Sequence, residues 1–373
     1  MKYMGSKRSM LLNGLGDLLA SSAPGAGRFV DLFAGSGAVA IHVATKYEMP
    51  VLASDLQQFS VVLAGAVLER KKALPWEECW NDWHQRAERI YMRYRPARLQ
   101  KVTRQAVMDF RTWSEGQDAL HLTKAYGGHY FSPVQAAWID ALRRTLPAKP
   151  PARTVALAAL LHVASKCAAS PGHTAQPLQP ARSANPYIFE AWSRDVPTLT
   201  RMLLQSLSKI FAKREGTAKV ADANEAADEI RPSDLVFVDP PYSGVQYSRF
   251  YHVLESIARG TAGEVSGSGR NPEPRMRPQS DYSLKRGAKG ALSELLGKIA
   301  ANGARAILTF PAHACSNGLS GDIVRELARE HFQVIEKLVD SKFSTLGGSK
   351  VEVGNGRAAR HAAQELILCL TPK

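Results

Sequence analysis

The sequence predicts an α/β protein whose parallel, doubly wound sheet is interrupted by an inserted, mainly helical domain. Two blocks, residues 28–70 and residues 234–373, alternate short apolar runs with helical patterns. This alternation is typical of a parallel sheet covered by helices. The segment between the blocks contains all six tryptophans and mostly helical patterns, so we expect a separate helical domain there.

The first block predicts a β-α-β-α unit. We expect strands at 28–32 and 51–55, and helices at 38–47 and from 56 to about 70. The chain from Phe33 to Gly37 is a glycine turn between the first strand and its helix. Glycine lets a backbone pass close to a ligand.

A ligand site is predicted at this turn. Asp55, at the tip of the second strand, is well placed to accept hydrogen bonds from ribose hydroxyls. The turn alone leaves alternatives open. Gly35 and Gly37, followed by Ala40, are close to a dinucleotide-binding fingerprint, and the same glycines also suit a tight turn without a ligand.

The second block opens with an apolar strand at 235–238 that runs into Asp239-Pro240-Pro241-Tyr242. Two prolines fix the backbone and remove two N–H donors, so the exposed polar groups are acceptors. Two acceptors on the hydrogens of an adenine amine would free its lone pair for attack on a methyl group. Tyr242 offers a flat face on which a base can stack. The alternative is that the whole segment is only a rigid turn with an aromatic anchor. The remaining elements of this block are expected at 247–257, 322–330 (helices), 304–310, 332–339 and 365–370 (strands).

The charge favours a polyanionic partner, because the 373 residues carry a formal net charge of +14. Between His84 and Arg111 lie eight lysines or arginines against two acidic residues. Helical spacing would put Arg86, Arg89 and Arg93 on one face, which we interpret as a substrate-binding surface. Residues 259–290 form a second basic stretch rich in Gly, Ser and Pro, expected as a flexible loop.

These motifs, together with Lys2-Tyr3-Met4-Gly5-Ser6-Lys7 at the N-terminus, resemble the successive motifs of the Dam-like DNA adenine methyltransferases. The resemblance implies a Rossmann-like S-adenosylmethionine-dependent methyltransferase sheet with a reversed last strand. It also implies S-adenosyl-L-methionine as methyl donor and an adenine flipped out of double-stranded DNA. The catalytic domain would comprise residues 1–74 and 216–373, and the target-recognition domain residues 75–215.

The resemblance carries over residue by residue. The catalytic residues would be Asp239, Pro240, Pro241 and Tyr242. The cofactor-binding residues would be Tyr3, Lys7, Asp31, Phe33, Gly35, Ser36, Gly37, Asp55, Leu56, Asp222 and Ala223. For Asp222 the match is looser, and capping of a helix is an equal alternative. No catalytic histidine and no metal are expected.

Three further segments resemble one subgroup of the family. They are Tyr126–Phe131 and Pro171–Gln176 in the inserted domain, and Gln246–His252 after the catalytic motif. We expect His173 and Gln176 to touch bases or phosphates, since a glutamine can read adenine edges. Tyr247 and Arg249 would hold the flipped nucleotide or its phosphate.

Other classes explain the sequence less completely. An RNA adenine methyltransferase shares the motifs, although the long insert favours duplex DNA. A protein-glutamine methyltransferase usually has Asn where this chain has Asp239. A nicotinamide oxidoreductase leaves the Asp239–Tyr242 segment without a role, and a catalytically silent DNA-binding module would not need the cofactor motifs.

The remaining expectations concern the setting of the protein. No apolar run long enough for a membrane span and no secretory signal is apparent, so we expect a cytoplasmic, nucleoid-associated protein. The four cysteines lie far apart and are expected as free thiols. A cognate restriction endonuclease or defence-system proteins are expected partners, and the protein would be a monomer or dimer.

Overall fold

The computed structural model describes residue 5, residues 7–344 and residues 360–373. These residues form two compact units. The sheet unit comprises Met4–Leu56, Gly216–Tyr247 and Gln279–Lys373, and the helical unit comprises Gln57–Glu215 and Ser248–Pro278.

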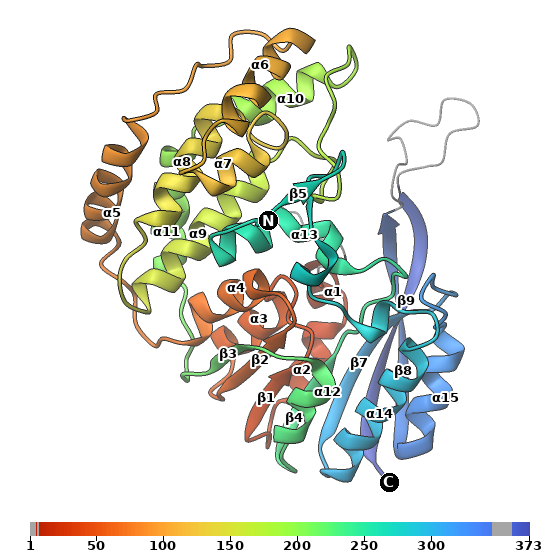
Figure 1. The fold of residues 1–373 in the computed structure, drawn as a ribbon. Helices are drawn as coiled ribbons and strands as arrows, with labels where there is room; N and C mark the ends of the chain where they lie inside the picture. The colour runs from red at the N-terminus through yellow and green to blue at the C-terminus, as the bar shows by residue number, and fades with distance from the viewer. Residues whose placement is uncertain (1–4, 6, 345–359) are drawn as a thin grey trace. The chain divides into compact units, whose positions relative to one another are not determined.

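A seven-stranded sheet forms the centre of the sheet unit, in the order β3-β2-β1-β4-β7-β9-β8 (Figure 1). Strand β9 is antiparallel to both of its neighbours, and the other pairings are parallel. The predicted α/β class is therefore confirmed, with one reversed strand near the edge. The strands are β1 (Arg28–Asp31), β2 (Val51–Asp55), β3 (Thr217–Val220), β4 (Asp234–Val238), β7 (Arg305–Pro311), β8 (Phe332–Ser344) and β9 (Arg360–Pro372).

Helices cover one face of this sheet with a continuous apolar core. Successive side chains of a strand point to opposite faces, so Val236 and Val238 of β4 share a face and pack among leucines of α14, including Leu292 and Leu296. The helices and 3₁₀ turns of the sheet unit are α1 (Arg8–Leu12), α2 (Leu15–Ser22), α3 (Ala38–Lys46), α12 (Ala223–Ala226), η1 (Ala227–Glu229), η3 (Asp281–Ser283), α14 (Ala288–Ala301) and α15 (Gly321–His331).

An ion pair also links β1 and β4 at their amino ends. The Arg28 guanidinium donates to both carboxylate oxygens of the buried Asp234, at 3.1 and 2.6 Å. The Arg231 N–H donates to the same carboxylate at 2.9 Å. This paired, buried carboxylate fixes the start of β4 beside β1, so the opposite ends of both strands meet at one edge.

The helical unit is built around α9, which is buried along nearly its whole length and packs against α4 and α11. Its elements are α4 (Gln58–Leu68), α5 (Trp76–Tyr91), α6 (Arg104–Glu115), α7 (His121–Tyr126), α8 (Pro133–Arg144), α9 (Ala152–Cys167), α10 (Asn185–Trp192), α11 (Val196–Ser208), α13 (Tyr247–Arg259), β5 (Val265–Ser266), β6 (Asn271–Pro272) and η2 (Pro274–Met276).

The helical unit extends beyond residues 75–215, the segment assigned to it from sequence, because α4 and most of α13 belong to it. Helix α4 is apolar all round and almost entirely buried. The Glu255 carboxylate of α13 accepts the N–H groups of Gln58 and Phe59, at 3.2 and 3.1 Å. It thereby satisfies donors in the first turn of α4, which have no partner within the helix.

Most predicted elements are confirmed to within a few residues, and strands β8 and β9 differ most in length. Strands β8 and β9 are longer than expected, because the two strands pair with each other from Phe332↔Pro372 to Ser344↔Arg360. Strand β3 and helix α14 were not predicted. In the described parts of the chain, no helix is both long and apolar enough to span a bilayer.

Candidate active site

The glycine turn after β1 has the backbone that the sequence predicts. Gly35 and Gly37 both have positive φ, at 50° and 72°. A side chain would be strained at such angles. The Gly35 N–H donates to the Asp55 carboxylate at 2.8 Å, and the Ala34 N–H donates to the Ser54 carbonyl at 3.0 Å. The end of β2 therefore fixes the shape of the turn.

Asp31 is a buried carboxylic acid at the end of β1. Its side chain accepts the Phe33 N–H at 3.3 Å. Burial raises the pKa of Asp31 to about 8, and the nearby Asp239 and Asp55 carboxylates add to the rise. Burial acts in this direction because it disfavours the charged form of a carboxyl group. Asp31 is therefore protonated in a large fraction of molecules near neutral pH.

Asp239 follows β4 directly and has two partners from other elements. The Thr309 hydroxyl of β7 donates to Asp239 Oδ1 at 2.9 Å. The ammonium group of Lys7 lies 3.1 Å from the same oxygen. The carboxylate is therefore held from two sides in one orientation.

Lys7 also pairs with Glu365 of β9, whose Oε2 lies 2.9 Å from the ammonium nitrogen. Burial lowers the pKa of Lys7, but Asp239 and Glu365 outweigh this effect and raise it above its ordinary value. Lys7 is therefore charged at every pH at which the protein would be assayed. Burial raises the pKa of Asp239, and Lys7 opposes that rise.

The turn formed by the two prolines is secured from the segment after β7. The fully buried Asn317 side chain donates to the Pro241 carbonyl at 2.8 Å and to the Tyr282 carbonyl at 2.9 Å. The Gly244 N–H donates to Ser316 Oγ at 2.8 Å. Sequence reasoning missed Asn317, Thr309 and Glu365, because no motif marks a single polar residue whose partner is distant in the chain.

Tyr242 lies between Gly5 and Tyr247. Its ring meets the Tyr247 ring edge-on, with centroids 6.4 Å apart. A Cβ atom on Gly5 would lie 2.9 Å from Tyr242 Oη, and Gly5 has φ of +75°, so any side chain at residue 5 would be strained and would displace the Tyr242 ring. Burial raises the pKa of the Tyr242 phenol.

The structure thus gathers the predicted motifs of the sheet unit at the carboxyl ends of β1, β2 and β4. Tyr3 lies outside the described residues. Phe33 packs edge-on against Tyr282, with ring centroids 5.0 Å apart. The Asp222 side chain accepts the Asn224 N–H at 2.8 Å and caps α12. Capping is a common role for aspartate, and it is the alternative that the sequence left open.

The predicted basic face of Arg86, Arg89 and Arg93 is wrong as a single helical face. Helix α5 ends at Tyr91, so Arg93 lies beyond it. A longer helix is also disfavoured by Pro96, since a proline disfavours helical geometry in the residue before it, and Arg95 has φ of 37°. Arg86 is also partly neutralised by Asp82, whose carboxylate lies 2.8 Å from it. Arg89 and Arg93 are exposed.

The loop containing His173 and Gln176 is held to α13 within the helical unit. Thr174 donates its N–H and its hydroxyl to the Phe250 carbonyl, at 2.6 and 2.9 Å. The His173 ring packs on Phe250, and its Nδ1 accepts the Ala175 N–H at 3.2 Å. Gln176 and Arg249 are exposed, and Phe250 is buried as predicted.

The basic segment 259–290 carries β5, β6, η2 and η3. The Tyr130 hydroxyl is hydrogen-bonded to the Gly269 carbonyl at 2.8 Å. Arg270 donates to the Ala125 carbonyl at 2.9 Å and to the Lys124 carbonyl at 3.1 Å, at the end of α7. Part of this basic charge is therefore engaged inside the protein, which the composition did not predict.

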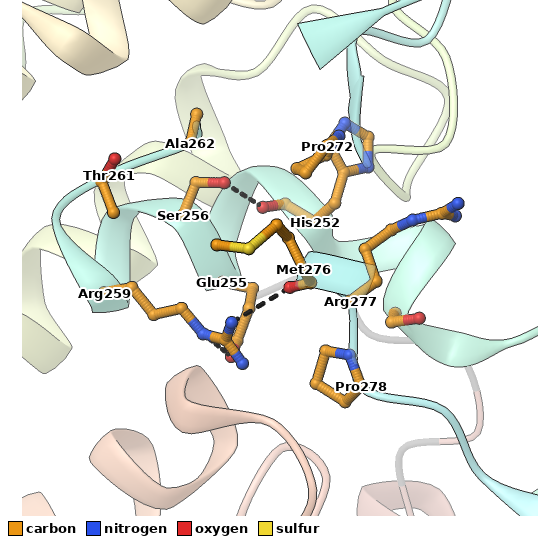
Figure 2. Close-up of a pocket in the computed structure, with 11 residues that line it drawn as sticks. His252, Glu255, Ser256, Arg259, Thr261, Ala262, Pro272, Met276, Arg277 and Pro278 are labelled. Atoms are coloured by element: carbon orange, nitrogen blue, oxygen red, sulfur yellow. Dashed lines mark hydrogen bonds and ion pairs between the residues drawn. The ribbon is translucent and has the colours of Figure 1, made fainter. Parts of the chain in front are cut away.

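A small cavity of about 30 Å³ lies in the helical unit, between α13 and the 272–278 segment (Figure 2). On its wall, Arg259 donates to Glu255 at 2.7 Å and to the Met276 carbonyl at 3.0 Å (Figure 2). The space is enough for about one water molecule. None of the residues predicted from sequence to bind substrate or cofactor lines it.

The sheet order, with a glycine turn after β1 and an acidic-Pro-Pro-Tyr segment after β4, is consistent with a Rossmann-like methyltransferase fold. The family model described as D12 class N6 adenine-specific DNA methyltransferase matches residues 3–114 and 199–270. The chain is similar to this family over these two segments, which make up just under half of its length and include the glycine turn and the Asp239–Tyr242 segment.

Individual relatives are modification methylases. The chain is similar to modification methylase LlaI of Lactococcus lactis subsp. lactis, with 26% identity over 80% of the chain and 44% of that protein. It is similar to modification methylase StsI of Streptococcus sanguinis, with 27% identity over 42% of the chain and 23% of that protein. The type II methyltransferase M.FokI of Planomicrobium okeanokoites is 34% identical over 21% of the chain and 12% of its own length. The chain thus spans less than half the length of each of these relatives.

Proposed function

We propose that this protein transfers a methyl group from S-adenosyl-L-methionine to the exocyclic amine of a flipped-out adenine in double-stranded DNA. The observation that carries the proposal is the fixed orientation of the Asp239 carboxylate by Lys7 and Thr309 beside the rigid Pro240–Pro241 turn. The family match supports the reaction and the nucleic acid. The formal net charge of +14 supports a polyanionic substrate.

Asp239 and the Pro240 carbonyl would accept the two hydrogens of the adenine amine. These bonds draw the nitrogen toward a pyramidal geometry and free its lone pair. Lys7 and Thr309 keep the carboxylate from rotating, so the orientation exists before the base arrives. Once methylation makes the nitrogen cationic, its proton can pass to Asp239 or to water. Tyr242 would stack on the base, which is worth about 1–3 kcal/mol.

The residues around the glycine turn fit S-adenosylmethionine. Gly35 and Gly37 present backbone at positive φ, and the carboxyl groups of Asp31 and Asp55 lie at neighbouring strand ends. We propose that Asp55 binds the ribose hydroxyls, because a carboxylate can accept several hydrogen bonds at once. The bound cofactor supplies an electrophilic methyl group on a sulfonium. Phe33, Ser36, Leu56, Asp222 and Ala223 are further proposed contacts.

In the helical unit we propose Arg89, Arg93, Gln176 and Arg249 as contacts to DNA, since all four are exposed. We also propose that residues 75–215 act as a recognition domain. The same proposal includes a cognate restriction endonuclease as partner and a cytoplasmic location. A modification methylase of this kind would protect DNA at the sites that the partner cleaves.

The decisive experiment measures transfer of labelled methyl groups from S-adenosylmethionine to duplex DNA, with the product base identified by mass spectrometry. Wild type should form N6-methyladenine. Asp239→Ala should reduce turnover by roughly 10²–10³-fold or more, the range for losing one oriented polar group in an active site. Calorimetric titration should still detect S-adenosylmethionine binding to this variant.

Asp322→Ala is the matched control, because Asp322 is exposed, pairs with Arg325 and lies in the same unit. It should methylate like wild type. Duplex RNA and duplex DNA of the same sequence are offered in competition. Methylation of RNA in preference to DNA would replace the proposal with the RNA alternative, and wild-type turnover by Asp239→Ala would remove the catalytic role of Asp239.

A further inference from the structure

Glu365 joins the catalytic cluster from a part of the chain that the family match does not reach, since the matched residues end at 270. It lies on β9, the antiparallel strand, opposite Pro311 of β7 in the register. Its carboxylate is 2.9 Å from the Lys7 ammonium, which is 3.1 Å from Asp239. Three charged side chains from distant parts of the sequence therefore form one cluster.

The second carboxylate changes the charge of this cluster. A lysine paired with Asp239 alone would make a neutral pair and would compete with the adenine amine for the carboxylate. With Glu365 present, Lys7 divides its charge between two carboxylates, and the cluster carries one net negative charge. Side-chain exposure is 5% for Lys7, 17% for Asp239 and 19% for Glu365. Water therefore screens these charges only weakly.

We propose that Glu365 is a positioning residue for methyl transfer, which holds Lys7 against Asp239 and keeps the cluster negatively charged where the adenine amine becomes cationic. This inference rests on the proposed function. Positive charge moves onto the amine nitrogen as the methyl group arrives, and a fixed negative charge nearby stabilises that state more than the ground state.

The titratable groups around Asp239 come from several elements. Lys7 precedes α1, Glu365 lies on β9, Asp31 ends β1, and Tyr242 follows in the same turn. Glu365 adds to the rise in the pKa of Asp239, and Lys7 lowers that pKa. Loss of the Glu365 charge therefore predicts a lower pKa for Asp239, and an acid limb of the kcat profile that moves to lower pH.

Glu365→Gln tests the inference, because it removes the charge and keeps the size of the side chain. We expect kcat on duplex DNA to fall by about 10- to 100-fold, the range found for outer-shell partners of metal ligands. The KM for DNA should change by less than about threefold, and the acid limb should move down in pH. Glu365→Asp restores the charge, so it should recover part of kcat and the wild-type acid limb.

Glu336→Gln is the matched control on the neighbouring strand β8, where Glu336 pairs with Arg325 away from the cluster. It should retain the wild-type kcat and pH profile. The inference is overturned if Glu365→Gln has the same kcat and pH profile as Glu336→Gln. It is also overturned if kcat of Glu365→Gln falls while the acid limb stays in place. If Glu365→Gln fails to fold, a wild-type kcat in Glu365→Asp at an altered acid limb would also contradict it.

The two proposals fail in different ways. A wild-type protein that forms no N6-methyladenine contradicts the proposed function. A wild-type protein that methylates, with an inactive Asp239→Ala and an unaffected Glu365→Gln, contradicts only the role of Glu365.

Discussion

Replacement of Gly5 by alanine should impair base binding through Tyr242. Gly5 has φ of +75°, and a Cβ atom there would lie 2.9 Å from Tyr242 Oη and 3.5 Å from its Cε1. The first separation is too short for any real contact, so the ring must move. Because Tyr242 is packed against Tyr247, displacement of the ring disturbs the surface on which the adenine is proposed to stack.

The magnitude has two parts. A non-glycine residue in this left-handed conformation costs about 1–2 kcal/mol of stability. Loss of stacking on Tyr242 costs a further 1–3 kcal/mol, roughly, in binding the base. We therefore expect kcat/KM for DNA to fall by about 5- to 150-fold, since about 1.36 kcal/mol corresponds to a factor of ten.

Gly25→Ala is the matched control. Gly25 has φ of +80°, and a Cβ atom on it would meet nothing within 4 Å. Both variants should lose similar stability in urea unfolding, while only Gly5→Ala should lose kcat/KM. 2-Aminopurine at the target position should report weaker stacking in Gly5→Ala.

A double variant tests the contact itself. Tyr242→Phe removes the oxygen at 2.9 Å and leaves ring atoms at ordinary separations of 3.5 and 3.6 Å. In the Tyr242→Phe background, Gly5→Ala should therefore cost less kcat/KM than in wild type. Equal values of kcat/KM for Gly5→Ala and Gly25→Ala would refute the reasoning.

Two further predictions concern charge. Asp31 has a pKa raised from 3.8 to about 8. Between these two values, each unit of rising pH should destabilise the fold by about 1.4 kcal/mol. The stability that Asp31 contributes is present below pH 3.8 and is lost as pH rises through 8. Asp31→Asn should thus gain stability over wild type as pH rises from about 5 to about 8. The prediction is excluded if the free energies of unfolding in urea of the two proteins change equally with pH. Neutralising Arg89 and Arg93 together should lower the slope of log affinity for DNA against log salt by up to about 0.9 per lost phosphate contact. Arg86→Gln should change the slope less, because Asp82 already pairs with Arg86, and an unchanged slope in the double variant would place the DNA contact elsewhere.

The local patterns of the sheet unit could be predicted because each depends on neighbouring residues. Apolar runs ending in Asp31, Asp55 and Asp239 predict strand ends, and Gly35 and Gly37 predict a turn with positive φ. The same reasoning failed at Arg93. The helical spacing of the arginines includes Arg93, but α5 ends at Tyr91. Pro96 disfavours a continued helix there. Periodicity alone does not locate a helix end.

The sequence by itself determined the class of fold, the glycine turn and the acidic-Pro-Pro-Tyr segment, because short-range backbone preferences decide all three. Only the tertiary structure decided which side chains surround Asp239. Lys7 and Glu365 are 358 positions apart, yet they meet at 2.9 Å because the sheet order brings β9 next to β7 and β7 next to β4. The physical reason is that strand order is set by packing over the whole sheet, and no local pattern encodes it.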